Sequence, residues 1–239
     1  MTNYFQMKAT NNVAQIDIFG EIVGSKWFDE ETSATSFRDA LKELGNVSTI
    51  NLSINSGGGS VFDGIAIYNM LKTHKATVNV YVEGLAASIA SVIAMAGDTI
   101  TMRSGSMLMI HMPFTVLQGN AEEMRKAADT LEKMGDNIVN IYSDRTGIST
   151  EEIQQIMSEE TWITAEEAVE QGWATRLDQK EAVMNSVPKE ILGRFSNVPK
   201  NVLDRVEREE KPKALSQDRI DLINREKQTL KLLKDEIGE

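Results

Sequence analysis

The sequence predicts an α/β fold, in which β-strands alternate with α-helices around a single large core. Half-buried strands are indicated where apolar and polar residues alternate, at 13–22, 48–55 and 77–84. Helices are indicated where apolar residues recur at helical spacing, at 32–44 and 64–74. A long amphipathic pattern over 120–146 predicts a helix longer than a crossover between parallel strands requires.

Shorter elements complete the predicted order. A helix of small residues is expected after the third strand, followed by two short strands, at 86–97, 100–101 and 107–110. Two more helices are expected after the long one, because a hydroxyl side chain precedes a glutamate by three residues in capping boxes at Ser149–Glu152 and Thr164–Glu167. Such a succession of strands and helices is typical of one large α/β domain.

The chain divides into one large domain over 1–185 and a C-terminal extension over 186–239. Beyond residue 185 prolines interrupt the pattern, the charge run REEKPK follows, and helical periodicity resumes over 215–237. We interpret the extension as a linker followed by a charged, solvated helix. Binding of a partner by this helix is the alternative.

Composition limits the classes of function. The chain has 239 residues, of which 41% are hydrophobic, and no apolar run approaches the roughly 20 residues that span a bilayer. Residues 1–10 lack a basic start and an apolar stretch, so no secretory signal is indicated and a cytoplasmic location is expected. The net charge of −11 argues against general nucleic-acid binding, which needs clustered cations. Proteins are therefore the expected partners.

Few residue types remain for chemistry. The chain has no cysteine and only two histidines, His74 and His111. Disulfides, thiolate nucleophiles and metal sites rich in cysteine or histidine are therefore excluded. Catalysis without a metal or another cofactor is expected.

Three segments rich in small residues predict one active site where strands give way to helices, at 54–60, 83–91 and 108–113. Ser88 follows an apolar strand and two alanines, so its hydroxyl lies near a helix start with little bulk around it. The amide of Ile89 could stabilise the oxyanion that forms when a serine attacks a carbonyl. Gly57–Gly59 let a second stretch of backbone approach and supply another donor. A close-packed helix contact is the alternative interpretation of this serine.

A serine needs a base within hydrogen-bond reach to act as a nucleophile at neutral pH. His74 lies in KTHK at the polar end of a predicted helix, so an exposed position without a catalytic role is expected for it. His111 ends the apolar strand MLMI, and strand ends are where α/β sheets deliver catalytic side chains. We therefore predict His111 as the general base of Ser88.

The three segments resemble the motifs of one peptidase family. INSGGG, GLAAS and MIHMP are similar, in order and approximate spacing, to the INSPGG, GxAAS and MIHQP motifs of ClpP serine peptidases. The resemblance runs from about Val13 to about Leu177 and includes TAEEAVEQGWAT, which is similar to xAxEAxExGLxD in the family. It implies repeated strand-strand-helix units of the ClpP/crotonase type. It also implies rings of identical subunits, heptameric or double, with 120–146 as the handle helix between them.

The same resemblance implies roles for individual residues. Ser88 is expected to be the nucleophile and His111 the general base, and the backbone amides of Gly59 and Ile89 are expected to form the oxyanion hole. The segment after His111 is expected to pair with an extended substrate through main-chain hydrogen bonds, by means of Phe114, Thr115, Val116 and Leu117.

The acid of the triad departs from the family pattern. Glu160 occupies the position of the aspartate in the family, and a glutamate can orient an imidazole, as Ser-His-Glu sites do. Glu159 is the fallback, and a merely solvated Glu160 is the alternative.

Three further features are similar to the ClpP-like head maturation (prohead) proteases of tailed phages and prophages: a short N-terminus, a glutamate in an ETW context and a charged C-terminal extension. Capsid precursor and scaffold proteins would then be trimmed inside an immature head, in the bacterial cytoplasm. The endopeptidase would be ATP-independent or ATPase-assisted, and the departures from the family pattern at both ends argue against an AAA+ ATPase partner. Three alternatives are a host ClpP paralogue working with an AAA+ unfoldase, a crotonase-type acyl-CoA enzyme and an inactive scaffold-binding module. The pairing of Ser88 with His111 argues against the last two.

Overall fold

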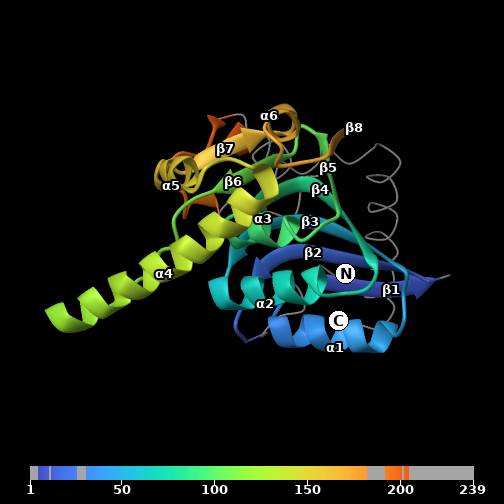
Figure 1. The fold of residues 1–239 in the computed structure, drawn as a ribbon, viewed down its shortest axis with the longest axis horizontal. Helices are drawn as coiled ribbons and strands as arrows, with labels where there is room; N and C mark the ends of the chain where they lie inside the picture. Colours follow the sequence, from blue (N-terminus) through green and yellow to red (C-terminus); the bar gives the residue numbers. More distant parts are fainter. Residues whose placement is uncertain (1–4, 11, 26–30, 182–191, 201, 205–239) are drawn as a thin grey trace, which may run out of the picture.

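A computed structural model describes residues 5–10, 12–25, 31–181, 192–200 and 202–204. They form an eight-stranded sheet flanked by helices (Figure 1). The strands are β1 (Phe5–Thr10), β2 (Val13–Ile22), β3 (Thr49–Gly59), β4 (Thr77–Ala87), β5 (Thr99–Ser104), β6 (Met107–Ile110), β7 (Thr161–Thr164) and β8 (Arg176–Glu181). The helices are α1 (Ala34–Leu44), α2 (Val61–Lys72), α3 (Ile89–Ala94), α4 (Ala121–Thr146), α5 (Thr150–Ser158) and α6 (Ala165–Glu170).

Parallel pairing builds the centre of the sheet. The strand order is β1-β2-β3-β4-β5-β8, with parallel pairs from β2 to β8 and an antiparallel β1 at one edge. The last part of β4, Leu85–Ala87, leaves β5 and pairs in parallel with β6, and β7 pairs antiparallel with β6. The residues that follow β4 and β6 are therefore brought to the same edge of the sheet.

The apolar positions of the strands are buried against helices. Alternate residues of the central strands have no exposed surface, among them Ile16, Ile18, Leu52, Ile54, Val80 and Val82. Helices α1 and α2 lie side by side on the sheet, and every residue of α3 is buried (Figure 1). Burial of this much apolar surface is the main stabilising contribution to the fold.

Helix α4 extends well beyond the rest of the molecule (Figure 1). Asn120 caps its start by accepting from the amides of the first turn, and the Glu123 side chain completes the capping box. Only the second half of the helix packs on the core, through residues that include Ile138 and Tyr142. The first half is largely exposed, with Met124 at 50% exposure.

The C-terminal segment packs on the sheet near β6. Leu192 and Val202 are buried in an apolar cluster whose other buried members are Leu85, Ala87, Met107 and Met109. Part of the expected extension therefore lies against the catalytic domain. The boundary at residue 185 stays a prediction, and the helical pattern over 215–237 lies outside the described residues.

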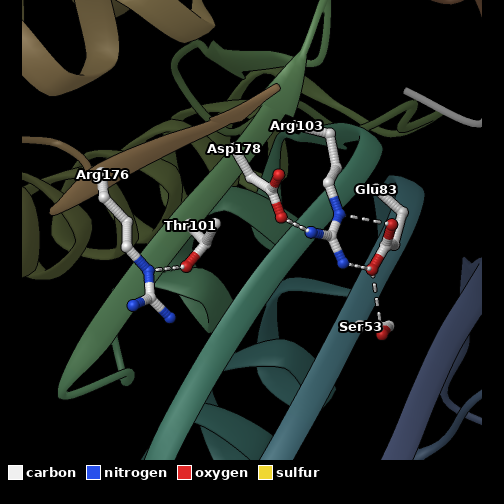
Figure 2. Close-up of polar contacts among 6 residues, drawn as sticks. All are labelled: Ser53, Glu83, Thr101, Arg103, Arg176 and Asp178. Atoms are coloured by element: carbon white, nitrogen blue, oxygen red, sulfur yellow. Dashed lines mark hydrogen bonds and ion pairs between the residues drawn. The ribbon is translucent and has the colours of Figure 1, made fainter. Parts of the chain in front are cut away.

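Polar side chains cross-link neighbouring strands on another part of the sheet (Figure 2). Arg103 of β5 donates to both carboxylate oxygens of Glu83 on β4, at 2.9 and 3.0 Å, and also pairs with Asp178 on β8. Beside them, Arg176 Nε donates to Thr101 Oγ1 at 2.7 Å. The guanidinium of Arg103 thus ties three adjacent strands together.

The architecture agrees with the predicted α/β class, and β2 and β6 have the predicted bounds. The helix expected over 86–97 begins only at Ile89, because Ala86 and Ala87 still pair with β6. The short strands β1, β7 and β8 were not predicted. Within the described ranges, none of the helices combines the length and apolar character needed to cross a membrane.

Candidate active site

Ser88 occupies the sharp turn between β4 and α3. Its backbone has φ 54° and ψ −129°, in a region that residues other than glycine seldom adopt. Such strain costs about 1–3 kcal/mol and persists only where the surroundings enforce it. Here the Ser88 amide donates to the carbonyl of Met109 at 2.8 Å, and the Ser88 carbonyl accepts from the amide of Ser91 at 3.0 Å. The turn leaves the Ser88 hydroxyl at the end of β4, without a capping bond to α3.

His111 is the first residue after β6, and the parallel pairing of β4 with β6 brings it to Ser88. Its Nε2 lies 2.8 Å from Ser88 Oγ. A hydroxyl that donates to Nε2 requires the neutral imidazole to carry its proton on Nδ1. The two residues predicted as nucleophile and base are therefore in hydrogen-bond contact.

The surroundings of His111 favour the form that a general base needs. Burial lowers the pKa of the imidazole below its ordinary 6.5, and the negative charge of Glu160 partly opposes this effect. The ring is therefore neutral near pH 7 and can accept the proton of Ser88.

The expected acid, Glu160, lies next to His111 because of the pairing of two short strands. Ile110 is opposite Thr161 in the antiparallel pair of β6 and β7, so the residues just beyond this pair are neighbours. Glu160 also has a positive φ, 52°, as does Ser88. The carboxylate of Glu159, the fallback, instead accepts from Gln155 Nε2 at 3.2 Å.

The expected oxyanion donors flank Ser88. Gly59 lines one pocket together with Ser88 and His111. Gly58 approaches so closely that a Cβ atom added to it would lie 2.8 Å from Ser88 Cβ and 3.1 Å from the amide nitrogen of Ile89. Ile89 is the first residue of α3, so its amide has no acceptor within the helix. The glycine-rich end of β3 and the start of α3 thus meet at Ser88.

The chain matches known proteins over most of this fold. The Clp protease family profile matches residues 28–181. The chain belongs to the Clp protease family. It is 31% identical over 172 residues to an ATP-dependent Clp protease proteolytic subunit of Bacteroides fragilis, covering 67% of this chain and 83% of that protein. It is 33% identical over 156 residues to proteolytic subunit 1 of Chlamydia abortus, covering 61% and 81% respectively.

A solved structure extends this likeness to three dimensions. A mutant of ClpP1 from Listeria monocytogenes is similar with a TM-score of 0.60 and 26% identity, covering 71% of this chain and 92% of that chain. The expected fold class and serine peptidase activity are therefore confirmed. The expected link to phage head maturation finds no support among these relatives.

In this Clp-family chain, the segment expected to pair with substrate is irregular. Residues 111–120 form no strand, and Phe114, Val116 and Leu117 are 58%, 94% and 46% exposed. An exposed segment beside the pocket of Ser88 can pair with an incoming peptide as an added strand. The expected role of this segment in substrate pairing stays a prediction. Phe114 also lines the pocket of Ser88, with its ring centroid 5.6 Å from that of His111.

Two further parts of this Clp-family site were not predicted from the sequence. Tyr142 of α4 reaches the turn of Ser88 through a hydrogen bond to Ser91, a polar residue within an otherwise apolar helix. Phe195 and Arg194 of the C-terminal segment line the Ser88 pocket. Among the residues that the structure describes, no cluster of three or more His, Asp or Glu side chains could hold a metal ion.

Proposed function

We propose that this ClpP-type peptidase hydrolyses peptide bonds with Ser88 as nucleophile, His111 as general base and Glu160 as the residue that orients His111. The contact of 2.8 Å between His111 Nε2 and Ser88 Oγ carries the proposal. It supplies what a serine nucleophile requires, a neutral base that is already in hydrogen-bond contact with the hydroxyl.

The reaction is acyl transfer. His111 Nε2 takes the proton of the Ser88 hydroxyl as Oγ attacks the carbonyl carbon of the substrate, and the amides of Gly59 and Ile89 stabilise the oxyanion. His111 then gives the proton to the leaving amine as the C–N bond breaks, which leaves an acyl-enzyme. A water molecule, deprotonated by His111, then attacks the ester. His111 returns the proton to Ser88 Oγ as the acyl–oxygen bond breaks, which releases the carboxylic acid product and restores Ser88.

The curated relatives favour a role as a proteolytic subunit. Both relatives described above are named as proteolytic subunits of ATP-dependent Clp proteases. We therefore infer a homo-oligomeric ring that degrades polypeptides delivered by an AAA+ unfoldase. The exposed first half of α4 and the exposed Val116 and Leu117 would provide surface for subunit contacts. Processing of capsid precursors is the second candidate, which the ETW context and the C-terminal extension favour.

The first test is labelling by a fluorophosphonate probe, followed by intact-mass and peptide-mass analysis. We expect one adduct, on Ser88, in the wild type, and none in Ser88→Ala. His111→Ala should label at least about 10³-fold more slowly, because members of such a site act as a unit. His74→Ala is the matched control, since it removes the other histidine, and it should label like the wild type. Normal labelling of His111→Ala would contradict the proposed mechanism.

The second test separates the two biological roles. The labelled-casein degradation rate is measured with and without a bacterial AAA+ unfoldase and ATP, and Ser88→Ala serves as the blank. ATP-dependent stimulation supports the role as a proteolytic subunit. Cleavage of a capsid precursor at the same rate with and without the unfoldase would favour the second candidate.

A further inference from the structure

The C-terminal segment 192–200 lies across the cleft that holds the catalytic pair. Arg194 and Phe195 line the same pocket as Ser88 and His111. The Phe195 ring meets the His111 imidazole edge-on, with 5.7 Å between the ring centroids. A peptide that approached Ser88 from this side would therefore meet the Phe195 side chain first.

The same segment binds the expected triad acid. The two oxygens of the Glu160 carboxylate accept from consecutive backbone amides, Ser196 N at 2.9 Å and Asn197 N at 2.6 Å. Asn197 also donates through its side-chain amide to the carbonyl of Glu159 at 3.0 Å. Hydrogen bonds from amides to a carboxylate are among the stronger ones in proteins, and here they engage the group that a triad would turn toward His111.

Side-chain contacts on both sides hold the segment in place. Leu192 and Val202 are 0% and 2% exposed, in the apolar cluster against β4 and β6. Arg194 pairs with Glu21 of β2 at 2.5 Å, and the Phe195 ring packs edge-on against Trp162 at 5.8 Å. Apolar packing, an ion pair and hydrogen bonds therefore together hold segment 192–200 against the rest of the fold.

We propose that residues 192–200 are an internal inhibitor of this peptidase, seated in the substrate cleft and displaced when a polypeptide enters. The inference rests on the proposed function of Ser88 and His111. Displacement uncovers His111 and frees the Glu160 carboxylate to accept from His111 Nδ1. The bonds to Glu160 lie at the surface, where water competes with them, so the central part of the segment can leave while Leu192 and Val202 remain packed.

A matched pair of variants in the full-length chain tests this inference. Ser196→Pro removes the amide hydrogen that Glu160 accepts, whereas Ser196→Ala keeps it and changes only the side chain. Phe195→Ala is a second releasing variant, which leaves the backbone intact. We expect Ser196→Pro and Phe195→Ala to raise the rate constant of Ser88 labelling about tenfold, and Ser196→Ala to label like the wild type.

Hydrogen–deuterium exchange of the peptide covering 192–204 gives a readout that does not depend on catalysis. We expect slow exchange in the wild type and in Ser196→Ala, and faster exchange in both releasing variants and in wild type carrying a probe adduct on Ser88. Labelling of Ser88 at one rate in all four proteins would overturn the internal inhibitor, and so would a slower rate in Phe195→Ala. A released segment with Ser88 still unlabelled in every protein would instead contradict the proposed peptidase mechanism.

Discussion

The hydroxyl oxygen of Tyr142 lies 2.8 Å from Ser91 Oγ, in a buried contact that joins α4 to the turn of Ser88. Ser91 Oγ in turn lies 2.5 Å from the carbonyl oxygen of Ser88 and 3.2 Å from that of Met109. Each hydroxyl has one proton and carbonyls only accept, so Tyr142 donates to Ser91 and Ser91 donates to Ser88. Burial raises the pKa of Tyr142, which keeps its hydroxyl protonated as the donor. The strained turn is thus held from α4.

Removal of this chain of hydrogen bonds should loosen the turn that holds Ser88. We expect Tyr142→Phe to lower the free energy of unfolding by about 1 kcal/mol, and Ser91→Ala by about 1–3 kcal/mol, because the latter leaves the Tyr142 hydroxyl buried without a partner. The double variant should cost less than the sum of the two. Denaturant titration measures these differences, and both single variants should label more slowly at Ser88. Strict additivity would show that the two hydroxyls do not interact.

The packing of α2 against α3 offers a test of the oxyanion hole from a distance. A Cβ atom on Gly64 would lie 2.1 Å from Cγ1 of Ile89, so Gly64→Ala must displace Ile89. We expect an unfolding free energy lower by about 1–3 kcal/mol, and a fall in kcat for peptide hydrolysis with little change in KM. Gly24→Ala is the control, because its Cβ would meet only Asp63 Oδ2, at an ordinary 3.6 Å. Equal activity of the two variants would argue against Ile89 as a donor.

The pH dependence of kcat/KM should report the pKa of His111. Activity needs the neutral imidazole, so kcat/KM falls as the pH drops through the pKa of His111. Since burial holds this pKa below 6.5, hydrolysis should persist into mildly acidic solution. Glu160→Gln removes the charge that raises this pKa, so the acidic limb should move to lower pH while the plateau rate falls. His74→Ala should reproduce the wild-type profile. A limb that moves to higher pH in Glu160→Gln would contradict the assigned charge interaction.

The ion pairs across the sheet should matter for stability rather than for catalysis. The side chains of Arg103 and Glu83 are only 13% and 17% exposed, so Arg103→Met leaves a largely buried carboxylate without its partner (Figure 2). We expect a loss of about 1–3 kcal/mol of unfolding free energy, with Ser88 labelling unchanged. Arg38→Met is the control, since Arg38 pairs with Asp39 at 51% and 54% exposure and should change stability by about 0.5 kcal/mol or less.

Local patterns in the sequence were sufficient to predict several of the main strands and helices. The alternation over Val13–Ile22 and the apolar run Met107–Ile110 predicted β2 and β6 with their observed bounds, and the 120–146 pattern predicted α4. These features depend on neighbours in the chain, since alternation, helical periodicity and capping each span only a few residues. The prediction of Ser88 and His111 as site residues rests on patterns of the same kind, because each residue follows a recognisable strand.

Other features depended on partners far along the chain. Ala86 and Ala87 are good helix formers, yet they end β4 because β6 pairs with them. Neither the contact of Ser91 with Tyr142 nor that of Glu160 with Ser196 has any periodicity that a sequence could display.

The sequence by itself thus determined which residue types could perform the chemistry and on which elements they lie. Only the tertiary structure decided that His111 Nε2 reaches Ser88 Oγ, and that the Glu160 carboxylate binds the amides of 196–197. The physical reason is that hydrogen bonds form over about 3 Å, a distance set by how strands and segments pack rather than by their spacing in the chain.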